Sequence, residues 1–235
     1  MTGRAADRDL LVSEVFGPTF QGEGPSLGEV AVFLRLSRCQ LNCSWCDTPY
    51  TWDTRRHDLS AETHRLSESQ VLDEVLARPA RLVVISGGEP LLQQDRLVWL
   101  IDMCRAHRRR VEIETNGAIV PSRGILAAAR GFNVSPKLAN SDVPVERRIN
   151  PEALRTFAKS GKAVFKFVVD TPDDLAEVAE LETTYGLAPI WVMPLGVTTD
   201  QVLRRAQDLA EDVLARGWNL TPRLHVLLWG DVRGR

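Results

Sequence analysis

Three cysteines, Cys39, Cys43 and Cys46, lie within eight residues in the spacing C-x3-C-x2-C. Thiolates this close together along a chain must curl around one small object. A 4Fe–4S cluster offers four irons, and cysteine thiolate is its usual protein ligand. Three thiolates therefore hold three irons and leave the fourth iron open to an outside ligand. The spacing predicts a cluster with one reactive position.

Structural zinc is the alternative for these cysteines, and it requires a fourth nitrogen or sulfur ligand. His57 and Cys104 are the candidates. Cys104 is in helical register with Leu97 and Ile101, which predicts a core position where free cysteine acts as a small apolar side chain. His57 stands in a charged stretch without a further signal. Trp45, just before the third cysteine, favours the cluster, and a zinc-stabilised binding module stays open as the alternative.

The 235 residues carry a net charge of −2, and 44% of them are hydrophobic, which is enough for one sizeable core. This charge gives no electrostatic footprint of a nucleic-acid partner. No apolar run reaches the roughly 18 residues of a membrane helix, so no membrane partner is expected either. Residues 1–9 lack the apolar centre of a signal peptide, and cysteines at metal-ligand spacing are typical of reducing compartments. We expect a cytoplasmic protein with one domain over residues 1–235, flexible at residues 1–9.

Apolar runs rich in β-forming residues alternate with amphipathic helical patterns along the chain. About six strand–helix units imply parallel strands joined by right-handed crossovers. A complete eight-unit barrel typically needs ~250 residues. The sequence therefore predicts an α/β fold, an incomplete (partial) TIM-like βα barrel. The predicted strands are Val30–Leu36, Arg81–Ser86, Val111–Thr115, Phe132–Ser135, Ala163–Val169 and Pro189–Met193.

Local signals mark several helix ends. Helix starts are predicted at Ser67, where a glutamine three positions later completes a capping box, and at Asn150 and Thr171, which each precede a proline. The last long helix is predicted to end at Gly217. The tail over residues 218–230 is predicted to be extended, with a proline in its middle.

In open parallel sheets, ligands gather beyond the carboxyl ends of the strands. Polar residues, glycines and prolines recur at these positions in this chain. They form the cysteine loop, SGGEP (residues 86–90), ETNG (residues 114–117), SPK (residues 135–137) and MP (residues 193–194). The sequence thus predicts an active-site rim along one edge of the sheet.

The cysteine loop after the first predicted strand, followed by Gly87–Pro90 (GGEP) after the second, resembles the radical S-adenosylmethionine (SAM) enzymes. In that superfamily the amino and carboxylate groups of SAM chelate the open iron. An electron from the cluster then cleaves SAM and releases a 5′-deoxyadenosyl radical. Glycines allow the backbone to approach a ligand closely, and the carboxylate of Glu89 is a suitable partner for an ammonium group.

Five further features resemble the 7-carboxy-7-deazaguanine synthase (QueE) family, and the resemblance spans residues 12–235. They are FQGEG (residues 20–24), Arg35 four residues before the first cysteine, CDT (residues 46–48), SPK (residues 135–137) and RLHVLLWG (residues 223–230). The tail departs from the family, because DVRGR follows the WG segment where members often end. A glycyl-radical activating enzyme, another small radical SAM protein, is the alternative within the superfamily, but it does not require FQGEG or CDT.

The resemblance implies a carbon–nitrogen lyase that converts 6-carboxy-5,6,7,8-tetrahydropterin into 7-carboxy-7-deazaguanine and ammonia, on the route to queuosine and other 7-deazapurines. It implies a 4Fe–4S cluster, SAM and Mg²⁺ as cofactors. It further implies hydrogen abstraction from C6 of the pterin, Mg²⁺-assisted ring contraction, an electron donor such as flavodoxin or ferredoxin, and a homodimer.

The resemblance also implies the site residues. The cluster ligands are Cys39, Cys43 and Cys46, and Thr48 carries the Mg²⁺. SAM is contacted by Trp45, Cys46, Asp47, Gly88, Ser135, Pro136 and Lys137. The pterin is contacted by Phe20, Gln21, Gly22, Arg35 and Ser86, with Glu23 as a further candidate.

The chemistry of these side chains agrees with such roles. A pterin presents a ring N–H beside an amino group, and Gln21 and Glu23 are able to pair with this edge. Arg35 falls in an apolar strand and needs a partner, which is either a substrate carboxylate or a structural ion pair.

Three polar residues in the strand that follows GGEP, within EIETNG (residues 112–117), are further candidates. Glu112, Glu114 and Asn116 alternate in sequence and so project to one face, where at least one is expected to touch SAM or its immediate surroundings, the alternative being a buried structural network. His225 either orients the substrate or packs under the tail.

Overall fold

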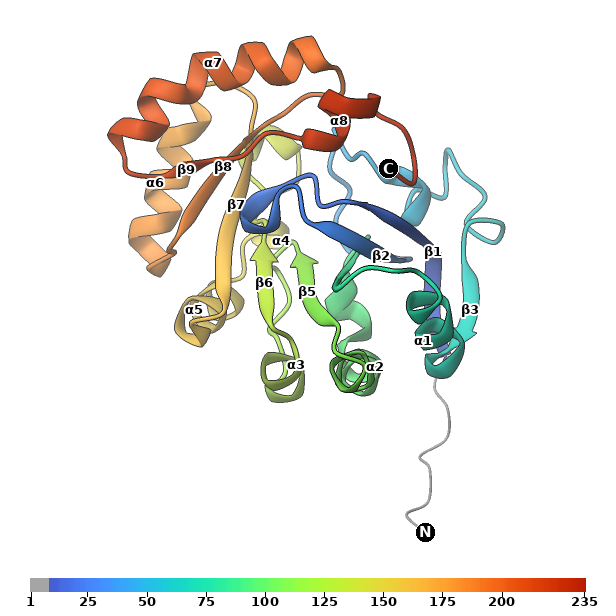
Figure 1. Ribbon diagram of the computed structural model, residues 1–235. Coiled ribbons are helices and arrows are strands. Elements are labelled where there is room, and N and C mark those ends of the chain that lie inside the picture. The colour runs from blue at the N-terminus through green and yellow to red at the C-terminus, as the bar shows by residue number, and fades with distance from the viewer. Residues whose placement is uncertain (1–8) are drawn as a thin grey trace.

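The computed structural model describes residues 9–235, which form one curved sheet with helices on its outer side (Figure 1). The strands are β1 (Asp9–Phe20), β2 (Val30–Leu36), β3 (His64–Ser67), β4 (Leu82–Gly87), β5 (Arg110–Thr115), β6 (Gly131–Val134), β7 (Ala163–Val169), β8 (Ile190–Pro194) and β9 (Asn219–Leu220). The α-helices are α1 (Glu68–Leu76), α2 (Gln94–Ala106), α3 (Arg123–Ala128), α4 (Val145–Arg148), α5 (Pro151–Ser160), α6 (Asp174–Tyr185), α7 (Thr199–Ala215) and α8 (Leu224–Trp229). Among residues 9–235, none of the helices combines the length and apolar character needed to cross a bilayer.

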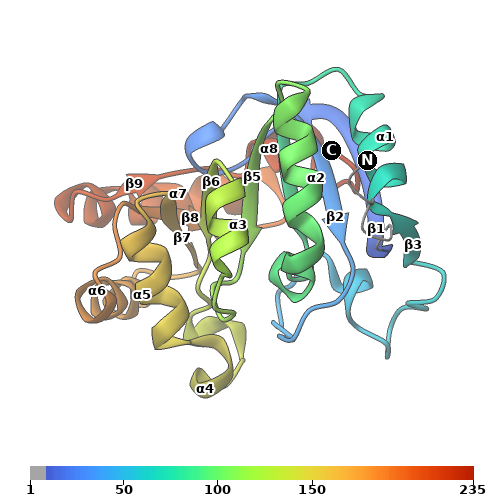
Figure 2. The ribbon, with the colours of Figure 1, turned by 90° about the horizontal axis from the view of Figure 1, so that it is seen from below.

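The strands are ordered β3-β1-β2-β4-β5-β6-β7-β8-β9 across the sheet. From β2 through β4 to β9 all neighbours in the sheet are parallel, and an α-helix precedes each strand from β4 to β9. The helices α1, α2, α3, α5 and α6 line up along the outer face (Figure 2). Within the described residues the sheet has β3 and β9 at its two edges, so the barrel is open. The predicted partial βα barrel of about six units is confirmed.

The amino-terminal part of the sheet differs from the prediction. β1 pairs antiparallel with both β2 and β3, and neither β1 nor β3 was expected. Asp9 is paired with Ser67 within this sheet, and the rest of the segment expected to be flexible, residues 1–8, lies outside the described residues. Two irregularities in the β1–β2 register interrupt the alternation that would reveal such a strand. FQGEG therefore follows a strand instead of preceding the first one.

The carboxyl-terminal tail also differs. Only Asn219–Leu220 is a strand, and Leu224–Trp229 forms the helix α8. A short apolar run fits a strand and a buried helix equally well by periodicity, and here the backbone N–H of Leu224 donates to the Gly22 carbonyl. The segment Leu224–Trp229 is therefore helical where its first residue contacts the Gly22 loop, which lies far away in the sequence.

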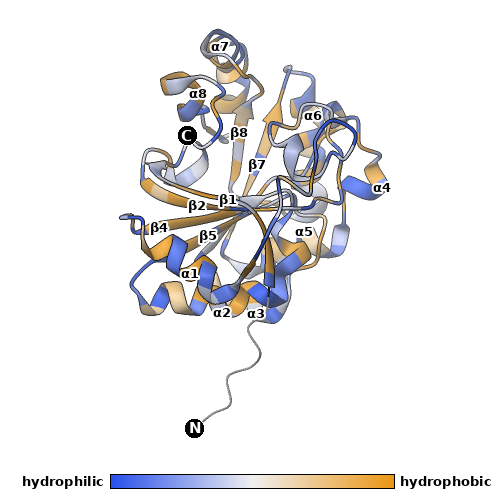
Figure 3. Ribbon diagram, turned by 90° about the vertical axis from the view of Figure 1, so that its right-hand side faces the viewer, coloured by the Kyte–Doolittle hydropathy of each residue, from blue (hydrophilic) through white to orange (hydrophobic). Residues whose placement is uncertain are grey.

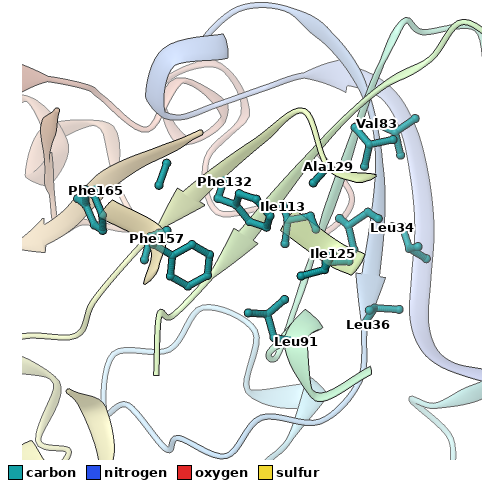
Figure 4. Close-up of a cluster of buried hydrophobic side chains, with 14 of the residues drawn as sticks. Leu34, Leu36, Val83, Leu91, Ile113, Ile125, Ala129, Phe132, Phe157 and Phe165 are labelled. Carbon is teal, nitrogen blue, oxygen red and sulfur yellow. The ribbon is translucent and has the colours of Figure 1, made fainter. Parts of the chain in front are cut away.

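The core lies between the sheet and the outer helices. On the strands, buried apolar residues alternate with residues that face the other way, so Ile113, Phe132 and Phe165 point toward the helices (Figure 4). The Phe132 and Phe157 rings lie 5.3 Å apart, a contact that adds about 1 kcal/mol beyond area burial. Polar and apolar residues segregate on the outer helices, as the hydropathy colouring shows (Figure 3).

Helix caps follow the predicted residues closely. Ser67 and Gln70 form a reciprocal capping box at the start of α1, and the Asn150 side chain accepts from two backbone N–H groups of α5. At Thr171 the predicted start is early, because α6 begins at Asp174 after a turn. These caps fix where each helix enters, and thereby where the loops at the strand ends lie.

Candidate active site

Five neighbouring strands contribute one polar residue each to the concave side of the sheet. They are Arg35 on β2, Ser86 on β4, Glu114 on β5, Asn133 on β6 and Lys166 on β7, and all five line one cavity. Arg35 is paired with Ser86 in the sheet register, and Glu114 with Asn133. Parallel strands covered on both faces are usually apolar throughout, so this polar row marks the concave face as a binding surface.

The cysteine loop closes one end of this cavity. Cys39, Cys43 and Cys46 all line it and all are free thiols. The Trp52 indole N–H donates to Cys46 Sγ over 3.2 Å, and the Leu41 backbone N–H donates to Cys39 Sγ over 3.4 Å. Such N–H···S bonds stabilise thiolates and tune the potential of a bound cluster.

The donor set fits a cluster better than a single ion. Burial raises the pKa of the Cys39 thiol to about 12 and also raises the pKa of Cys43, so these groups ionise only beside strong positive charge such as iron. Within residues 9–235, no group of three or more His, Cys, Asp or Glu side chains is placed to hold a single metal ion. Cys104 lies in the core on α2, as predicted, and His57 packs edge-on against Tyr50. The zinc alternative therefore lacks a site among the described residues.

The GGEP loop packs against the backbone of the cysteine loop. A Cβ on Gly88 would lie 2.1 Å from the Arg38 carbonyl oxygen, and one on Gly87 would lie 2.2 Å from the Leu36 carbonyl oxygen. The Gly88 and Glu89 N–H groups donate to these same two residues over 2.9 and 2.8 Å. Arg38 itself has a left-handed φ of 82°. The glycines thus serve the approach of two protein segments, although Gly88 also lines the cavity.

Glu89 has a structural role that differs from the expectation. Its buried carboxylate accepts hydrogen bonds from the backbone N–H groups of Leu91 and Asn116 and from the Thr115 hydroxyl, over 2.7 to 2.8 Å. Burial raises the pKa of Glu89, and these hydrogen bonds oppose that shift. This carboxylate joins the ends of β4 and β5, and because Glu89 is fully buried and does not line the cavity, it does not meet an ammonium group there.

The predicted SAM-contacting residues gather beside the cysteines, with one exception. The Trp45 indole N–H donates to the Asn140 carbonyl over 2.9 Å, and Lys137 Nζ lies 5.4 Å from the centre of the Trp45 ring. Lys137 Nζ also donates to Ser135 Oγ over 3.0 Å. Trp45, Ser135 and Lys137 line the cavity, whereas Pro136 is buried away from it near Gly117.

Thr48 and Asp47 line the cavity directly after the third cysteine. Thr48 Oγ1 lies 3.7 Å from Cys46 Sγ, and the Thr48 carbonyl accepts from the Thr51 hydroxyl over 2.8 Å. Asp47 forms an ion pair of 2.5 Å with Arg223. The CDT segment therefore links the cysteine loop to the opposite wall of the cavity.

The opposite wall is built around Glu23. Its carboxylate pairs with Lys166 and, over 3.4 Å, with Arg223 Nε. Lys166 is 5% exposed and Arg223 is 4% exposed. Burial raises the pKa of Glu23, but the two cations outweigh burial and hold this pKa well below its usual value. Glu23 is thus a carboxylate fixed in place at the cavity wall.

Sequence reasoning missed Lys166 and Arg223. Lys166 carried a usable signal, since it is a charged residue within the apolar run of β7, the same signal that identified Arg35 on β2. Arg223 stands at the start of the RLHVLLWG segment, but the sequence does not show that it reaches a glutamate 200 positions away.

Gln21 contacts Glu114, one of the three residues predicted to alternate along β5 and its carboxyl end. Gln21 Nε2 donates to Glu114 Oε1 over 3.1 Å, and Asn116 Nδ2 lies 3.9 Å from Cys39 Sγ. Glu114 and Asn116 line the cavity, while Glu112 accepts from the Ser26 hydroxyl outside it. Two of the three alternating residues therefore face the site.

Arg35 has a structural ion pair and still reaches the cavity. Its Nε donates to Glu14 Oε1 over 2.8 Å, and the Tyr50 hydroxyl donates to the same oxygen over 2.9 Å. The guanidinium also lies 5.3 Å from the centre of the Phe16 ring. The ion pair holds Arg35 in position, and its guanidinium retains N–H donors for a second anion.

The helix α8 covers the cavity from the carboxyl-terminal side. His225 packs so closely on Gly22 that a Cβ there would lie 2.0 Å from His225 Nδ1, and burial lowers the pKa of His225. Phe20 stacks on Trp229 with ring centres 6.1 Å apart. After α8 the chain returns to the cysteine-loop side, where Arg233 lies 3.9 Å from the centre of the Tyr50 ring (Figure 1).

Three free thiols that line one cavity beyond the end of the first parallel strand of an open βα barrel define the class of radical SAM enzymes. A sequence model described as the Radical SAM superfamily matches residues 34–190. The same fold occurs in the structure of Streptococcus suis SuiB bound to S-adenosylmethionine, with 15% sequence identity and a TM-score of 0.51. The match covers 80% of this chain and 49% of the SuiB chain.

More similar proteins narrow the class to a family. The 7-carboxy-7-deazaguanine synthase of Pyrobaculum aerophilum is 35% identical over 96% of this chain and 97% of its own length, and that of Rhodopirellula baltica is 33% identical over 98% and 91%. The crystal structure of QueE from Escherichia coli matches with a TM-score of 0.70 at 27% identity, covering 92% of this chain and 95% of that one. The chain belongs to the 7-carboxy-7-deazaguanine synthase family of the radical SAM superfamily, and this membership implies a 4Fe–4S cluster and SAM.

Proposed function

We propose that the protein converts 6-carboxy-5,6,7,8-tetrahydropterin into 7-carboxy-7-deazaguanine and ammonia. One observation carries this proposal beyond family membership: a single cavity is lined by three thiols, by a fixed carboxylate, Glu23, and by Arg35 of the polar row. That arrangement offers a cofactor site and a site for a polar, anionic heterocycle side by side.

The residues of this chain fit the two implied cofactors. Cys39, Cys43 and Cys46 would hold the cluster, and Trp45, Asp47, Gly88, Ser135 and Lys137 would contact SAM. When bound, the two cofactors supply a 5′-deoxyadenosyl radical for hydrogen abstraction. The protein's contribution is to orient the substrate and exclude side reactions. Pro136 supports this wall from behind, since it is buried away from the cavity.

The substrate end is proposed to recognise the two polar edges of the pterin. Glu23, held ionised by Lys166 and Arg223, would accept hydrogen bonds from a ring N–H and the adjacent amino group. Gln21 and the Phe20–Gly22 backbone would flank this edge, and Arg35 would bind the 6-carboxylate with the help of Ser86.

Mg²⁺ is proposed to bind at Thr48. Thr48 lines the cavity with its hydroxyl 3.7 Å from Cys46 Sγ, and Mg²⁺ prefers oxygen ligands while retaining several waters. One protein hydroxyl with substrate oxygens and waters would complete such a shell. The ion would hold the substrate oxygens while the ring contracts.

The remaining partners are proposed from the family resemblance. We infer a small-molecule substrate, a flavodoxin or ferredoxin as electron donor, and a homodimer. A cytoplasmic location agrees with four free cysteines among the described residues, because reducing compartments keep thiols free.

An anaerobic assay tests the function directly. The reconstituted protein is supplied with 6-carboxy-tetrahydropterin, SAM, Mg²⁺ and a reductant, and the products are separated by chromatography. We expect 7-carboxy-7-deazaguanine with equimolar ammonia. A protein that cleaves SAM but leaves the pterin unchanged would overturn the proposed substrate, and a glycyl-radical activating enzyme would behave in this way.

A further inference from the structure

One residue of the polar row has no partner within the protein. Asn133 is 5% exposed, lines the cavity and makes no hydrogen bond through its side chain with any of residues 9–235. Its Nδ2 atom is fully buried without an acceptor. Because at least about nine in ten buried polar groups in proteins are hydrogen-bonded, a buried amide without a partner requires an explanation.

The location of Asn133 distinguishes it from the other unpaired groups. Ser13 Oγ and Thr19 Oγ1 also lack hydrogen bonds among the described residues, but neither residue lines the cavity, and Asp170 Oδ1 is paired with Arg205 over 2.6 Å. The charged residues of the polar row all have partners: Arg35 pairs with Glu14, Glu114 accepts a hydrogen bond from Gln21, and Lys166 pairs with Glu23. Asn133 is therefore an unused hydrogen-bonding group at the place where a ligand would bind.

Its neighbours place Asn133 at one particular end of the cavity. It is paired in register with Glu114 on β5, and the next strand, β7, carries Lys166. A Cβ on Gly24 would lie 3.7 Å from Asn133 Oδ1, so the amide sits beneath the loop that carries Glu23. Arg35 lies three strands away on β2, which corresponds to roughly 14 Å at about 4.8 Å per strand.

Strands this far apart leave room for a carboxylated pterin together with the side chains that bind its two ends. With the 6-carboxylate at Arg35, the pyrimidine edge falls near Glu23 and Asn133. That edge presents an acceptor, the 4-oxo oxygen, next to two donors, N3–H and the 2-amino group. Glu23 meets the donors, which leaves the acceptor in need of an N–H group.

We propose that Asn133 is a specificity-determining residue that donates a hydrogen bond from Nδ2 to the 4-oxo oxygen of the pterin. The inference rests on the proposed function and adds the residue that distinguishes a 4-oxo from a 4-amino ring. Because Nδ2 is buried, donation to the ligand requires rotation of the amide about χ2, which exchanges the places of Nδ2 and Oδ1. The 4-amino analogue lacks both the acceptor that pairs with Asn133 and the N3–H that pairs with Glu23, so both residues disfavour it, and the change of preference in an Asn133 variant reports on Asn133 itself.

Binding of two unreactive probes tests this assignment. The cluster-loaded enzyme with SAM is titrated with 6-carboxypterin and with 2,4-diaminopteridine-6-carboxylate, and the ratio of the two Kd values is the readout. We expect the wild type to favour 6-carboxypterin by about ten-fold or more. Asn133→Asp, which is nearly isosteric but presents acceptors, is expected to move this ratio by at least about ten-fold toward the diamino probe.

Controls separate the possible failures. Asn133→Ala is expected to weaken 6-carboxypterin and to reduce the preference without reversing it, and the cluster absorbance verifies that each variant is folded and loaded. If Asn133→Asp and Asn133→Ala keep the wild-type ratio while the wild type turns over the pterin, the role of Asn133 is refuted and the proposed function stands. If the wild type binds neither probe and does not turn over the pterin, the proposed function fails and the role of Asn133 fails with it.

Discussion

Backbone hydrogen bonds hold the cysteine-loop end of the cavity, whereas buried ion pairs hold the α8 end. At the first end, Gly88 and Glu89 donate to the segment that leads into Cys39. At the second, Glu23 meets Lys166 and Arg223, which lie 143 and 200 positions away in sequence. Backbone contacts demand glycines but no particular side chain, while ion pairs depend on each charge. The two ends should therefore fail in different ways when they are mutated.

The largest effect is expected for Cys43→Ala. With one of three thiolates removed, the cluster loses a ligand, so bound iron and turnover should both fall to background. Iron content, visible absorbance and product formation measure this. Cys104→Ala is the matched control, because Cys104 is buried in the core on α2 and should keep the cluster at a modest cost in stability. Retained activity in Cys43→Ala would refute the ligand assignment.

Gly88→Ala should damage the same end through the backbone. The new methyl group would meet the Arg38 carbonyl oxygen at 2.1 Å, which forces the cysteine loop to move. We expect poor cluster loading and a fall in kcat of about 100-fold or more. Gly131→Ala is the control, since its nearest neighbour would be an ordinary 3.6 Å away. Normal iron content in Gly88→Ala would contradict the proposed coupling of the two loops.

Lys166→Met should damage the other end while the cluster stays bound. Loss of one partner of a buried ion pair lowers the free energy of unfolding by about 3 to 5 kcal/mol. Because Glu23 is then no longer held in place for the substrate, kcat/KM should fall about 100-fold or more. Burial raises the pKa of Glu23 and Lys166 now opposes it, so in the variant the carboxylate protonates at higher pH. The acid limb of the kcat/KM profile should therefore move to higher pH.

Lys166→Arg keeps the positive charge and should restore the wild-type acid limb in part. An acid limb that does not move in Lys166→Met, in a folded and cluster-loaded enzyme, would show that Lys166 does not govern the ionisation of Glu23. Buried ion pairs would then not be what holds the α8 end of the cavity in its working state.

Thr48→Ala should have a narrower effect, because Thr48 belongs to neither set of contacts. We expect intact cluster absorbance and a magnesium requirement about ten-fold higher, corresponding to one lost oxygen ligand. Thr48→Ser keeps the hydroxyl and should titrate like the wild type. An unchanged magnesium titration in Thr48→Ala would count against the metal assignment.

The smallest effect is expected for Arg233→Ala in the tail. Arg233 pairs with Glu14 and Glu62 and lies over Tyr50, but its side chain is 43% exposed. Such contacts contribute about 1 kcal/mol or less to the free energy of unfolding. Denaturant titration should show this loss with cofactor loading unchanged. Arg204→Ala removes an exposed pair within α7 and serves as the baseline, and an equal loss in both variants would show that the tail adds nothing to the cysteine-loop end.

Much of the fold was predictable because each parallel strand carries its own signal. The apolar runs of β2 and β4 to β8 and the caps at Ser67 and Asn150 needed no distant information. β1 was hidden by its register irregularities, and α8 by an apolar run that fits helix and strand alike. Both of these elements depend on partners that lie far away in the sequence.

The sequence by itself determined the cysteine-loop end of the site, since thiolates three and four positions apart cannot avoid one another. It also placed Arg35 and Glu23 among the candidates. Only the tertiary structure decided which charges meet them, which carboxylate is committed to the fold at Glu89, and that the Asn133 amide is left without a partner. Local spacing is a property of the covalent chain, whereas ion pairs and unpaired groups arise from the register of strands and the path of crossovers, which the chain settles only as it folds.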